Sequence, residues 1–319
     1  MSEFELIQRY FSDRQSPAAH IPLSIGDDCA LMSVSSGMQL AVSTDALVEG
    51  RHFFAGADAR TLGHKSLAVN LSDLAAMGAT PRAFTLALTL PDVREEWLAN
   101  FSAGLFDLAA QFDCQLIGGD TTRGPLNICI TVLGEIPDGL AHRRDAARPG
   151  DDIWISGSLG DARLALCCYL NQQTLSAADL ELSSIRLHAP TPRVALGLAL
   201  RGVARAAIDL SDGLSGDLAH ILKRSKCGAT VWCDALPIGA VLSQQSKSMQ
   251  REFALVGGDD YELCFTAPCA RRNDVLEAGR LTNTPVTRVG VIEAEPGCRY
   301  VDVDNKLLSL SLNSFDHFQ

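Results

Sequence analysis

Residues 67–81 read LAVNLSDLAAMGATP, and the pattern of this stretch decides how the first half of the chain folds. Its leucine, alanine, valine and methionine residues predict a buried helix, which the Gly-Ala-Thr-Pro sequence at its end terminates. Asp73 lies inside this apolar helix and shares one face with Asn70 and Ser66. A buried carboxylate without a partner is costly or becomes neutral, so Asp73 requires a cation.

Two kinds of cation fit this position. Lys65 is the only nearby base, and an ion pair with Lys65 or with an arginine from elsewhere is one interpretation. The other is a metal ion, because many of the remaining aspartates occur in similar short motifs. These motifs are GDD (26–28), STD (43–45), NLSD (70–73), GGD (118–120), DLSDG (209–213) and GGDD (257–260).

Taken singly, such a motif is commonly a turn, and we interpret PGDDI (149–153) in that way, with no chemistry. Most of the six motifs come where a strand pattern ends or a glycine turn begins, and strand ends in α/β folds point side chains into a shared crevice. Carboxylates with Ser and Thr oxygens, without paired Cys or His spacing, are typical ligands of Mg²⁺ or Mn²⁺. Because Mg²⁺ usually bridges carboxylates to phosphates, the motifs predict several ions around a polyphosphate.

The length of 319 residues predicts two domains. The turn and fresh strand in ARPGDDIWISGSLG (147–160) place the break near residue 150, giving domains 1–150 and 151–319. The first half is predicted to be strand-helix-strand-helix-strand-strand after a short helix, which indicates an α/β or α+β fold. Helices are expected over 4–12, 61–77, 94–112, 161–172, 176–188 and 192–205, and strands over 39–44, 83–90, 114–120, 126–136, 152–157, 229–233, 262–267 and 286–292.

Composition excludes several classes of protein. The formal charge is −11 and few of the basic residues are Lys, which argues against a nucleic-acid surface. No apolar run is long enough to span a membrane, and the acidic N-terminus is unlike a signal peptide, so a cytoplasmic protein is expected. The ten cysteines lack CxxC spacing and are interpreted as reduced thiols, mostly buried. TLGHKS (61–66) lacks the first glycine of a P-loop, and no G-x-G-x-x-G is present.

In this order the motifs resemble those of the thiamine-monophosphate kinases, which transfer a phosphoryl group from ATP to thiamine phosphate. The resemblance runs from about residue 4 to residue 318 and rests on seven segments. They are SIGDDCALM (24–32), STDALVEGRHF (43–53), NLSDLAAMGATP (70–81), LIGGDTTRGP (116–125), AIDLSDGLSGDL (207–218), GGDDYELCF (257–265) and FDHF (315–318).

The resemblance implies the two-domain fold of the aminoimidazole ribonucleotide synthetase-like superfamily. In that fold an N-terminal α/β domain pairs its sheet with a second subunit, an α+β domain follows, and the active site lies between the two domains. The implied partners are ATP, thiamine monophosphate and a second copy of the chain, with neither nucleic acid nor membrane. The implied reaction is direct in-line phosphoryl transfer assisted by several Mg²⁺ ions, with no general base.

The resemblance also implies roles for individual residues. Metal ligands would be Asp28, Ser43, Thr44, Asp45, Asp73, Asp120, Asp209 and Asp212. ATP would be contacted by Gly119, Asp120, Arg144 and Ser211. Thiamine phosphate would be contacted by His52, Asp259 and Phe315, where the family often carries Glu at the second position and Tyr or Trp at the third.

Two alternatives stay open at this stage. One is another ATP-dependent enzyme of the superfamily, although the reactive cysteine of selenophosphate synthetases has only Cys29 as a counterpart, and the chain ends in FDHFQ rather than the Cys of the hydrogenase maturation dehydratase. The other is a non-catalytic sensor of thiamine phosphate or nucleotide. The retention of Asp, Ser or Thr at every expected metal position favours an enzyme.

Overall fold

The computed structural model describes residues 3–14 and 18–310, which fall into two compact units. Unit 1 contains the described residues up to Leu74 together with Ala79–Gly139, and unit 2 contains Ala75–Gly78 and the described residues from Leu140 onward. From Leu140 onward the described residues belong to unit 2, whereas the sequence predicted a domain boundary near residue 150. The reason is that the intervening segment packs into unit 2, where Ala147 belongs to the hydrophobic core.

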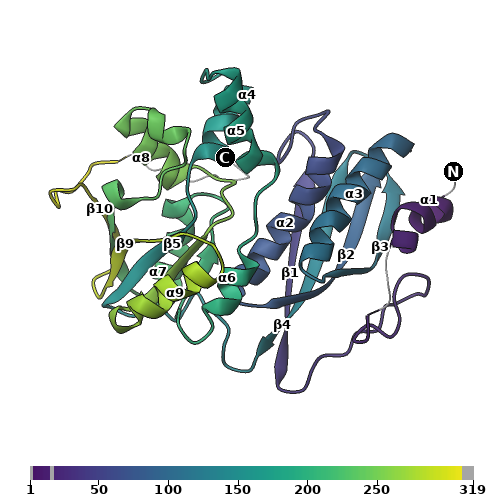
Figure 1. Cartoon of the computed structure of the whole chain (residues 1–319), viewed down its shortest axis with the longest axis horizontal. Helices are drawn as coiled ribbons and strands as arrows, with labels where there is room; N and C mark the ends of the chain where they lie inside the picture. Colours follow the sequence, from purple (N-terminus) through teal and green to yellow (C-terminus); the bar gives the residue numbers. More distant parts are fainter. Residues whose placement is uncertain (1–2, 15–17, 311–319) are drawn as a thin grey trace. The chain divides into compact units, whose positions relative to one another are not determined.

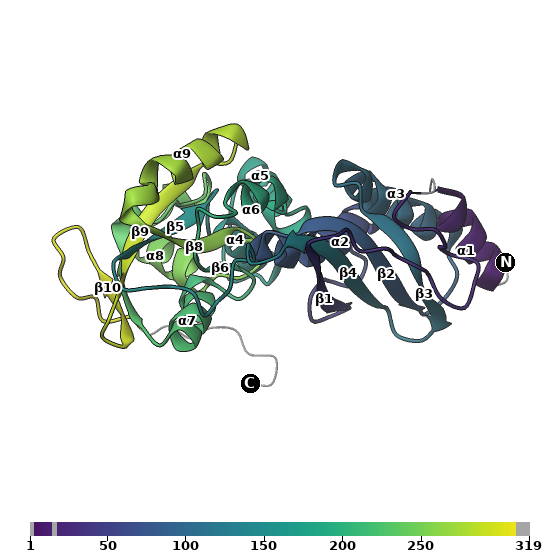
Figure 2. The same ribbon diagram turned by 90° about the horizontal axis from the view of Figure 1, so that it is seen from below.

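Unit 1 is a four-stranded sheet with its helices on one face (Figures 1 and 2). The strand order is β1-β4-β2-β3, with β2 and β3 parallel and the other neighbours antiparallel. The strands are β1 (Met38–Val48), β2 (Thr80–Leu90), β3 (Gln115–Arg123) and β4 (Asn127–Pro137), and the helices are α1 (Glu3–Tyr10), η1 (Ser12–Arg14), α2 (Ala59–Met77) and α3 (Glu95–Gln111).

Helices α2 and α3 cross with their backbones in contact. A Cβ atom added at Gly63 of α2 would lie 2.1 Å from the carbonyl oxygen of Phe101, and one added at Gly104 of α3 would lie 1.8 Å from that of Arg60. Only glycine fits at such a crossing. Gly63 of the TLGHKS segment therefore has a packing role, consistent with the sequence-based rejection of a P-loop there.

In the part of the chain that the structure describes, no helix covers the second face of the unit 1 sheet. The segment between α1 and β1 covers one end of this face, where Ile21 packs with Ala83 and Ile117. Towards the edge strand β1, apolar side chains are exposed, with Leu40 at 45%, Val42 at 57% and Val48 at 38%. Alternate residues along a strand share one face, so these three side chains form an apolar row, which we call the β1 row.

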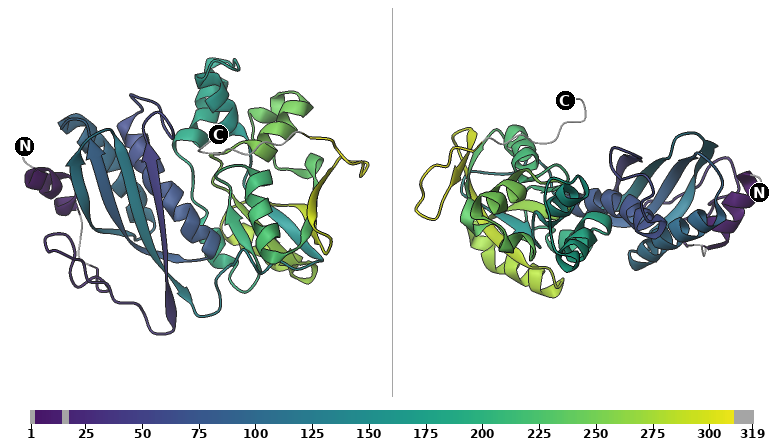
Figure 3. Two further views of the ribbon diagram at one scale, coloured as in Figure 1. Left: turned by 180° about the vertical axis from the view of Figure 1, so that it is seen from behind. Right: turned by 90° about the horizontal axis from the view of Figure 1, so that it is seen from above.

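Unit 2 is built on a six-stranded sheet with helices on both faces (Figures 2 and 3). The order is β10-β7-β9-β5-β8-β6, and only β10 and β7 are parallel. The strands are β5 (Asp151–Ser156), β6 (Ala207–Asp209), β7 (Gly228–Trp232), β8 (Leu263–Pro268), β9 (Val286–Glu293) and β10 (Gly297–Val301). The helices are α4 (Asp161–Tyr169), α5 (Ala177–His188), α6 (Val194–Ala199), α7 (Leu214–Ser225), α8 (Lys247–Val256) and α9 (Arg272–Leu281), with short 3-10 helices η2 (Cys233–Ala235), η3 (Leu242–Gln244) and η4 (Cys269–Arg271).

Most predicted elements of both units are present with shifted ends. The main exception is the helix expected over 192–205, which ends at Ala199 because Gly202 takes a left-handed conformation with φ +71° in the turn that follows. All ten cysteines are free, as expected, and half of them are buried, while Cys29 and Cys269 are exposed. No helix in the described ranges is long and apolar enough to cross a membrane. The cytoplasmic location stays a prediction.

Asp151 and Asp152, expected to form a plain turn, open β5 instead and are almost fully buried. Asp151 pairs with Arg205 at 2.7 Å, and Asp152 pairs with Arg272 and Arg288. The arginines hold the pKa of the Asp152 carboxyl below its usual range against the opposing effect of burial. The expected plain turn is therefore wrong, and these two aspartates form ion pairs at the start of a strand.

His142 offers a pH-dependent test of unit 2. Its buried ring donates from Nε2 to the carbonyl oxygen of Gly197 at 2.9 Å, and burial lowers the pKa of this imidazole. A lowered folded-state pKa means that the unfolded chain binds the proton first, so this contribution to the free energy of unfolding is present above the ordinary pKa of 6.5 and is lost as pH falls below it.

We expect the melting temperature of the wild type to fall by a few degrees more than that of His142→Gln between pH 7 and pH 5, because the glutamine amide can still donate but does not titrate. Differential scanning calorimetry measures this difference. The control is His220→Gln, which changes an exposed histidine on α7. Equal pH slopes for the wild type and His142→Gln would contradict the assignment.

Candidate functional site

The six acidic motifs divide between the two units. GDD lies in the loop before β1, STD lies in β1, NLSD lies in α2 and GGD lies in β3, all within unit 1. DLSDG follows strand β6, and GGDD lies between α8 and β8, both within unit 2. The candidate site residues therefore form two groups, one in each unit.

The polar face of α2 meets the edge strand β1. Ser43 donates its hydroxyl to Oδ2 of Asp73 at 2.5 Å, and the backbone N–H of Asp45 donates to Oδ1 of Asn70 at 3.2 Å. The amide of Asn70 in turn donates to the carbonyl oxygen of Ser66 at 2.9 Å, one turn earlier. The face predicted from Ser66, Asn70 and Asp73 is confirmed, and it points at the STD motif.

Asp73 is half-buried, while Ser72 and Leu74 on either side of it are fully buried. The sequence predicted a fully buried carboxylate, but Asp73 is only half-buried, because it faces Ser43 on the edge strand β1. Lys65, the alternative cation, is buried two turns earlier in α2. A cationic group of the chain therefore lies in the same helix as the carboxylate.

The other predicted metal ligands of unit 1 are not all on this side of the sheet. Strand pairing places Asp120 beside Ala87, and Ala87 beside Cys129. Asp45 pairs with Ile130, the residue next to Cys129, so Asp45 and Asp120 lie in adjacent rows of the sheet. Because side chains alternate along a strand, Asp120 lies on the helix-free face. Thr44 lies on that face too, with its hydroxyl 2.8 Å from that of Thr131. Asp28 is exposed, and its backbone N–H donates to Oδ1 of Asp27 at 2.8 Å.

Gly119 of the GGD motif has a structural reason to be glycine. Its φ is +150°, and a Cβ atom there would lie 1.8 Å from the carbonyl oxygen of Leu86 on the neighbouring strand. Gly118 has neither a positive φ nor any atom within 4 Å of such a Cβ. The two adjacent glycines therefore differ, and only the second is required by the fold.

His52 closes the turn that follows β1. The backbone N–H of Val48 donates to Nδ1 of His52 at 3.0 Å, and the N–H of His52 donates back to the carbonyl oxygen of Val48 at 2.9 Å. Accepting this bond leaves Nε2 as the N–H donor of the neutral ring. The imidazole is thus held in one tautomer by local backbone. Phe315 lies outside the described residues.

In unit 2 the DLSDG and GGDD motifs lie side by side. The N–H of Asp259 donates to the carbonyl oxygen of Ser211 at 2.9 Å, and that of Tyr261 donates to Leu210 at 2.8 Å. A Cβ atom at Gly258 would lie 2.5 Å from the carbonyl oxygen of Ser211, so a side chain there would push the loops apart. The fold therefore brings Asp209, Ser211, Asp212 and Asp259 into one neighbourhood.

Asp217 is a member of this neighbourhood to which the sequence analysis gave no role. It lies in the first turn of α7, is 4% exposed, and accepts the backbone N–H of Asp212 at 3.2 Å. Burial raises the pKa of Asp217 to about 7, while Arg144 acts in the opposite direction. Arg144 is therefore close enough to act electrostatically on this loop. The available signal was an Asp shortly after the glycine of DLSDG, the position of a helix-start residue that binds backbone N–H groups.

Within residues 3–14 and 18–310 no three Asp, Glu, His or Cys side chains converge closely enough to form a metal site by themselves. Two of the expected ligands, Ser43 and Asp73, contact each other directly, and the backbone N–H of Asp45 donates to Asn70 beside them. Ligands from Ser and Thr hydroxyls, and from a bound polyphosphate, would have to complete any coordination sphere.

Comparison with known proteins gives a full-length match. Residues 26–136 match the family model of the AIR synthase related protein, N-terminal domain, and residues 148–303 match the model of its C-terminal domain. The thiamine-monophosphate kinase of Escherichia coli K12 is 46% identical over 319 residues, covering 99% of this chain and 98% of the relative. The thiamine-monophosphate kinase of Haemophilus influenzae is 43% identical over 325 residues, covering 100% and 98%.

Solved structures of similar proteins match the fold of this chain over nearly its full length. The thiamine-monophosphate kinase of Stenotrophomonas maltophilia K279a has a TM-score of 0.88 at 46% identity, covering 97% of this chain and 98% of that chain. AaThiL complexed with AMPPCP and TMP has a TM-score of 0.79 at 29% identity, covering 99% and 97%. The hydrogenase maturation protein HypE in complex with ATP, at 22% identity and a TM-score of 0.78, shares the fold.

The glycine pair of β3 yields a prediction. We expect Gly119→Ala to lower the free energy of unfolding by about 1–3 kcal/mol, because the new methyl group overlaps the backbone of β2. We expect the matched control Gly118→Ala to change it by less than about 0.5 kcal/mol. Chemical denaturation followed by circular dichroism measures both. Equal effects of the two substitutions would contradict the close approach.

Proposed function

Because the chain belongs to the AIR synthase related family, and within it to the thiamine-monophosphate kinases, it is a kinase, and we propose that its reaction is Mg²⁺-dependent transfer from ATP to thiamine monophosphate. The observation that carries the proposal is the 46% identity to a thiamine-monophosphate kinase across 99% of this chain. The complex of AaThiL with AMPPCP and TMP supports both substrates. The products would be thiamine diphosphate and ADP.

The donor set fits Mg²⁺. The expected ligands offer only carboxylate and hydroxyl oxygens, which are the atoms that Mg²⁺ prefers, and they include no thiol or imidazole. The half-buried Asp73 also keeps a solvent-accessible side, which an ion with its own water ligands requires. We propose that the ions are held by Asp28, Ser43, Thr44, Asp45, Asp73, Asp120, Asp209 and Asp212. When bound, such ions neutralise the charge on the phosphates.

The proposed reaction is a direct in-line displacement. An oxygen of the thiamine monophosphate phosphate forms a bond to the γ-phosphorus of ATP, while the bond from that phosphorus to the β,γ-bridging oxygen breaks and its electron pair leaves on ADP. The acceptor phosphate is already ionised at neutral pH, so no general base is required. The chain contributes chiefly by orienting the two anions.

Individual side chains then have defined tasks. The bond that Nδ1 of His52 accepts leaves the ring N–H at Nε2, and an N–H donor suits a phosphate oxygen of thiamine monophosphate. Asp259 and the face of Phe315 suit the cationic thiazolium end of that substrate. Gly119, Asp120, Arg144 and Ser211 would contact the nucleotide, Arg144 as the cation beside its phosphates.

The experiment that tests this function is an incubation of the purified protein with ATP, Mg²⁺ and thiamine monophosphate. Thiamine diphosphate should form in proportion to ADP and should disappear when a chelator is added. Binding of thiamine monophosphate without ADP formation would instead indicate a sensor. Neither binding nor product would indicate a different ATP-dependent reaction of the superfamily. Replacing Mg²⁺ with Mn²⁺ in the same assay measures the metal preference.

The helix-free face of unit 1 supports a homodimer. The β1 row of Leu40, Val42 and Val48 leaves apolar surface in water, and burying such surface is favourable. We propose that a second copy of the chain covers this face.

The first prediction from this proposal concerns Asp73. We expect Asp73→Asn to lower kcat at saturating Mg²⁺ by at least about a hundredfold, because the amide is a weaker ligand and carries no charge. The protein should stay folded, since the position is half-buried. The matched control is Asp107→Asn on the exposed side of α3, where the carboxylate pairs only with Arg60. Near-normal turnover of Asp73→Asn would rule out a metal-binding role.

The second prediction concerns the dimer. We expect Val42→Glu to weaken self-association at least about tenfold, because it places a charge in the middle of the β1 row. Light scattering after size-exclusion chromatography measures the mass. The control is Val93→Glu, which charges a similarly exposed valine before α3. A wild type that is monomeric at micromolar concentration would refute the proposed dimer.

A further inference from the structure

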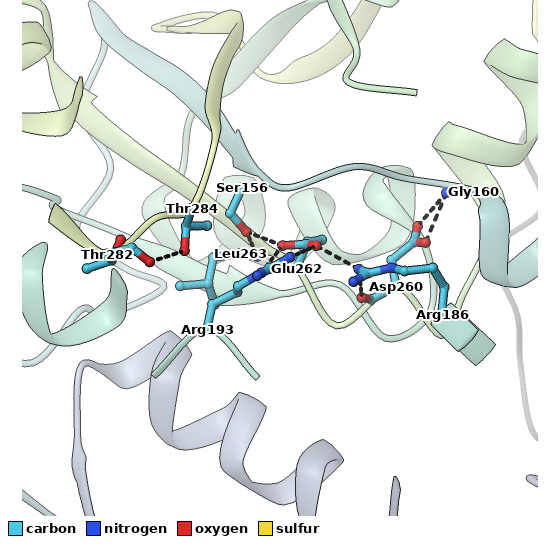
Figure 4. Close-up of polar contacts among 9 residues, drawn as sticks. All are labelled: Ser156, Gly160, Arg186, Arg193, Asp260, Glu262, Leu263, Thr282 and Thr284. Atoms are coloured by element: carbon cyan, nitrogen blue, oxygen red, sulfur yellow. Dashed lines mark hydrogen bonds and ion pairs between the residues drawn. The ribbon is translucent and has the colours of Figure 1, made fainter. Parts of the chain in front are cut away.

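A cluster of buried charges lies directly beside the GGDD motif of unit 2 (Figure 4). Its centre is Glu262, whose side chain is fully buried. Arg193 donates to both carboxylate oxygens of Glu262, at 2.6 and 2.5 Å, and Arg186 donates to one of them at 2.6 Å. Ser156 completes the set with a hydroxyl hydrogen bond of 2.6 Å. We call these four residues the Glu262 cluster.

A glycine next to Ser156 leaves space for the Glu262 carboxylate. Gly157 follows Ser156 with a φ of +55°, and a Cβ atom there would lie 2.0 Å from Oε1 of Glu262. Ser156 also accepts the backbone N–H of Leu263 at 2.8 Å, so one hydroxyl fixes both the side chain and the start of β8. Burial lowers the pKa of Arg193, but its bonds to Glu262 more than compensate and raise it overall. Arg193 therefore stays charged.

Stability alone does not account for such a cluster. A buried ion pair is expensive to desolvate, and apolar residues of similar size often give equal or greater stability. What fixed ion pairs provide is one defined geometry. Figure 4 shows Arg193 and Arg186 approaching Glu262 from different directions, which fixes the carboxylate in position and orientation.

The segment that the cluster anchors is strained. Asp259 and Tyr261 have φ values of +65° and +48°, a left-handed conformation that costs free energy for residues other than glycine. The residues around them are held on both sides. Arg186 donates to the carbonyl oxygen of Asp260 at 3.0 Å, and the N–H of Gly160 donates to the Asp260 carboxyl at 2.9 Å. Strained conformations of this kind persist only where the surroundings determine them fully.

We propose that the Glu262 cluster is a positioning device for Asp259, holding the GGDD loop in the one conformation that presents this carboxylate to the organic end of thiamine monophosphate. The inference rests on the proposed function for the identity of the ligand. Glu262, Arg186 and Arg193 are positioning residues, since they act through the loop and not on the substrate.

The cluster should affect the two substrates unequally. Asp259 lies three residues from Glu262 and is the proposed contact for thiamine monophosphate. Ser211 and Asp212, proposed for ATP and metal, belong to a loop that has an additional support from α7, because Asp217 accepts the N–H of Asp212. Weakening the cluster should therefore raise the KM for thiamine monophosphate more than the KM for ATP.

The test compares Glu262→Gln with Asp151→Asn. Asp151 is a matched control, because it is an equally buried carboxylate paired with Arg205 at 2.7 Å and lies at the opposite end of β5 from Ser156. Both variants are assayed well below their own melting temperatures. We expect Glu262→Gln to raise the KM for thiamine monophosphate about ten- to a hundredfold, the effect of misplacing a contact by about 1 Å, and the KM for ATP less than about threefold. Asp151→Asn should leave both near the wild-type values.

A conservative variant keeps the test decisive if Glu262→Gln does not fold. Arg193→Lys retains the charge but loses the two-point contact, and it should raise the KM for thiamine monophosphate by a smaller factor. An unchanged KM in Arg193→Lys and Glu262→Gln, or an equal rise in Asp151→Asn, would overturn the proposal.

Hydrogen exchange separates this proposal from the proposed function. The amides of Asp259 and Tyr261 donate to Ser211 and Leu210, so their exchange should be slow in the wild type and Asp151→Asn and faster in Arg193→Lys. This readout needs no substrate. If the wild type makes no thiamine diphosphate, the proposed function fails, while unchanged exchange in Arg193→Lys would show that the cluster does not hold the loop.

Discussion

A carboxylate in a protein interior needs a positive charge or hydrogen-bond donors, or it becomes neutral, and this constraint organises both units of the chain. One group of carboxylates is matched by arginine. Glu135 in unit 1 binds Arg82, and Glu262, Asp151 and Asp152 in unit 2 have arginine partners at 2.5–3.3 Å. A second group includes Asp73, which accepts the hydroxyl of Ser43, and Asp212, and both residues are only partly buried. The first group fixes the fold, and the second is suited to exogenous cations.

Several features of the fold and of the candidate site could be predicted from the sequence. The apolar spacing around Asp73 predicted the helix, its polar face and the terminating turn, and the motifs predicted the family and its two domains. The face of the sheet on which Asp120 lies could not be predicted. It depends on the parallel register of β2 with β3 and on a bulge in that pairing, and both are set by tertiary contacts.

Unit 2 was less predictable for physical reasons. Strand β6 has three residues and forms by pairing with β8, so no local sequence pattern predicts it. The backbone pairing of residues 210–211 with 259–261 joins two motifs that are far apart in the chain, and no spacing rule relates them. Glu262 looked like part of a strand pattern, and only its arginine partners from α5 and the segment before α6 distinguish it from a core residue.

The central claim is that Asp45, Asp73 and the other proposed ligands hold divalent cations around ATP. Electron paramagnetic resonance of Mn²⁺ bound in the presence of a non-hydrolysable ATP analogue tests this most directly. The account requires more than one tightly bound Mn²⁺ per chain for the wild type, and fewer when Asp45 and Asp73 are both changed to Asn. A wild type that holds no Mn²⁺ beyond the ion carried by the nucleotide, or an unchanged count in the double variant, would contradict it.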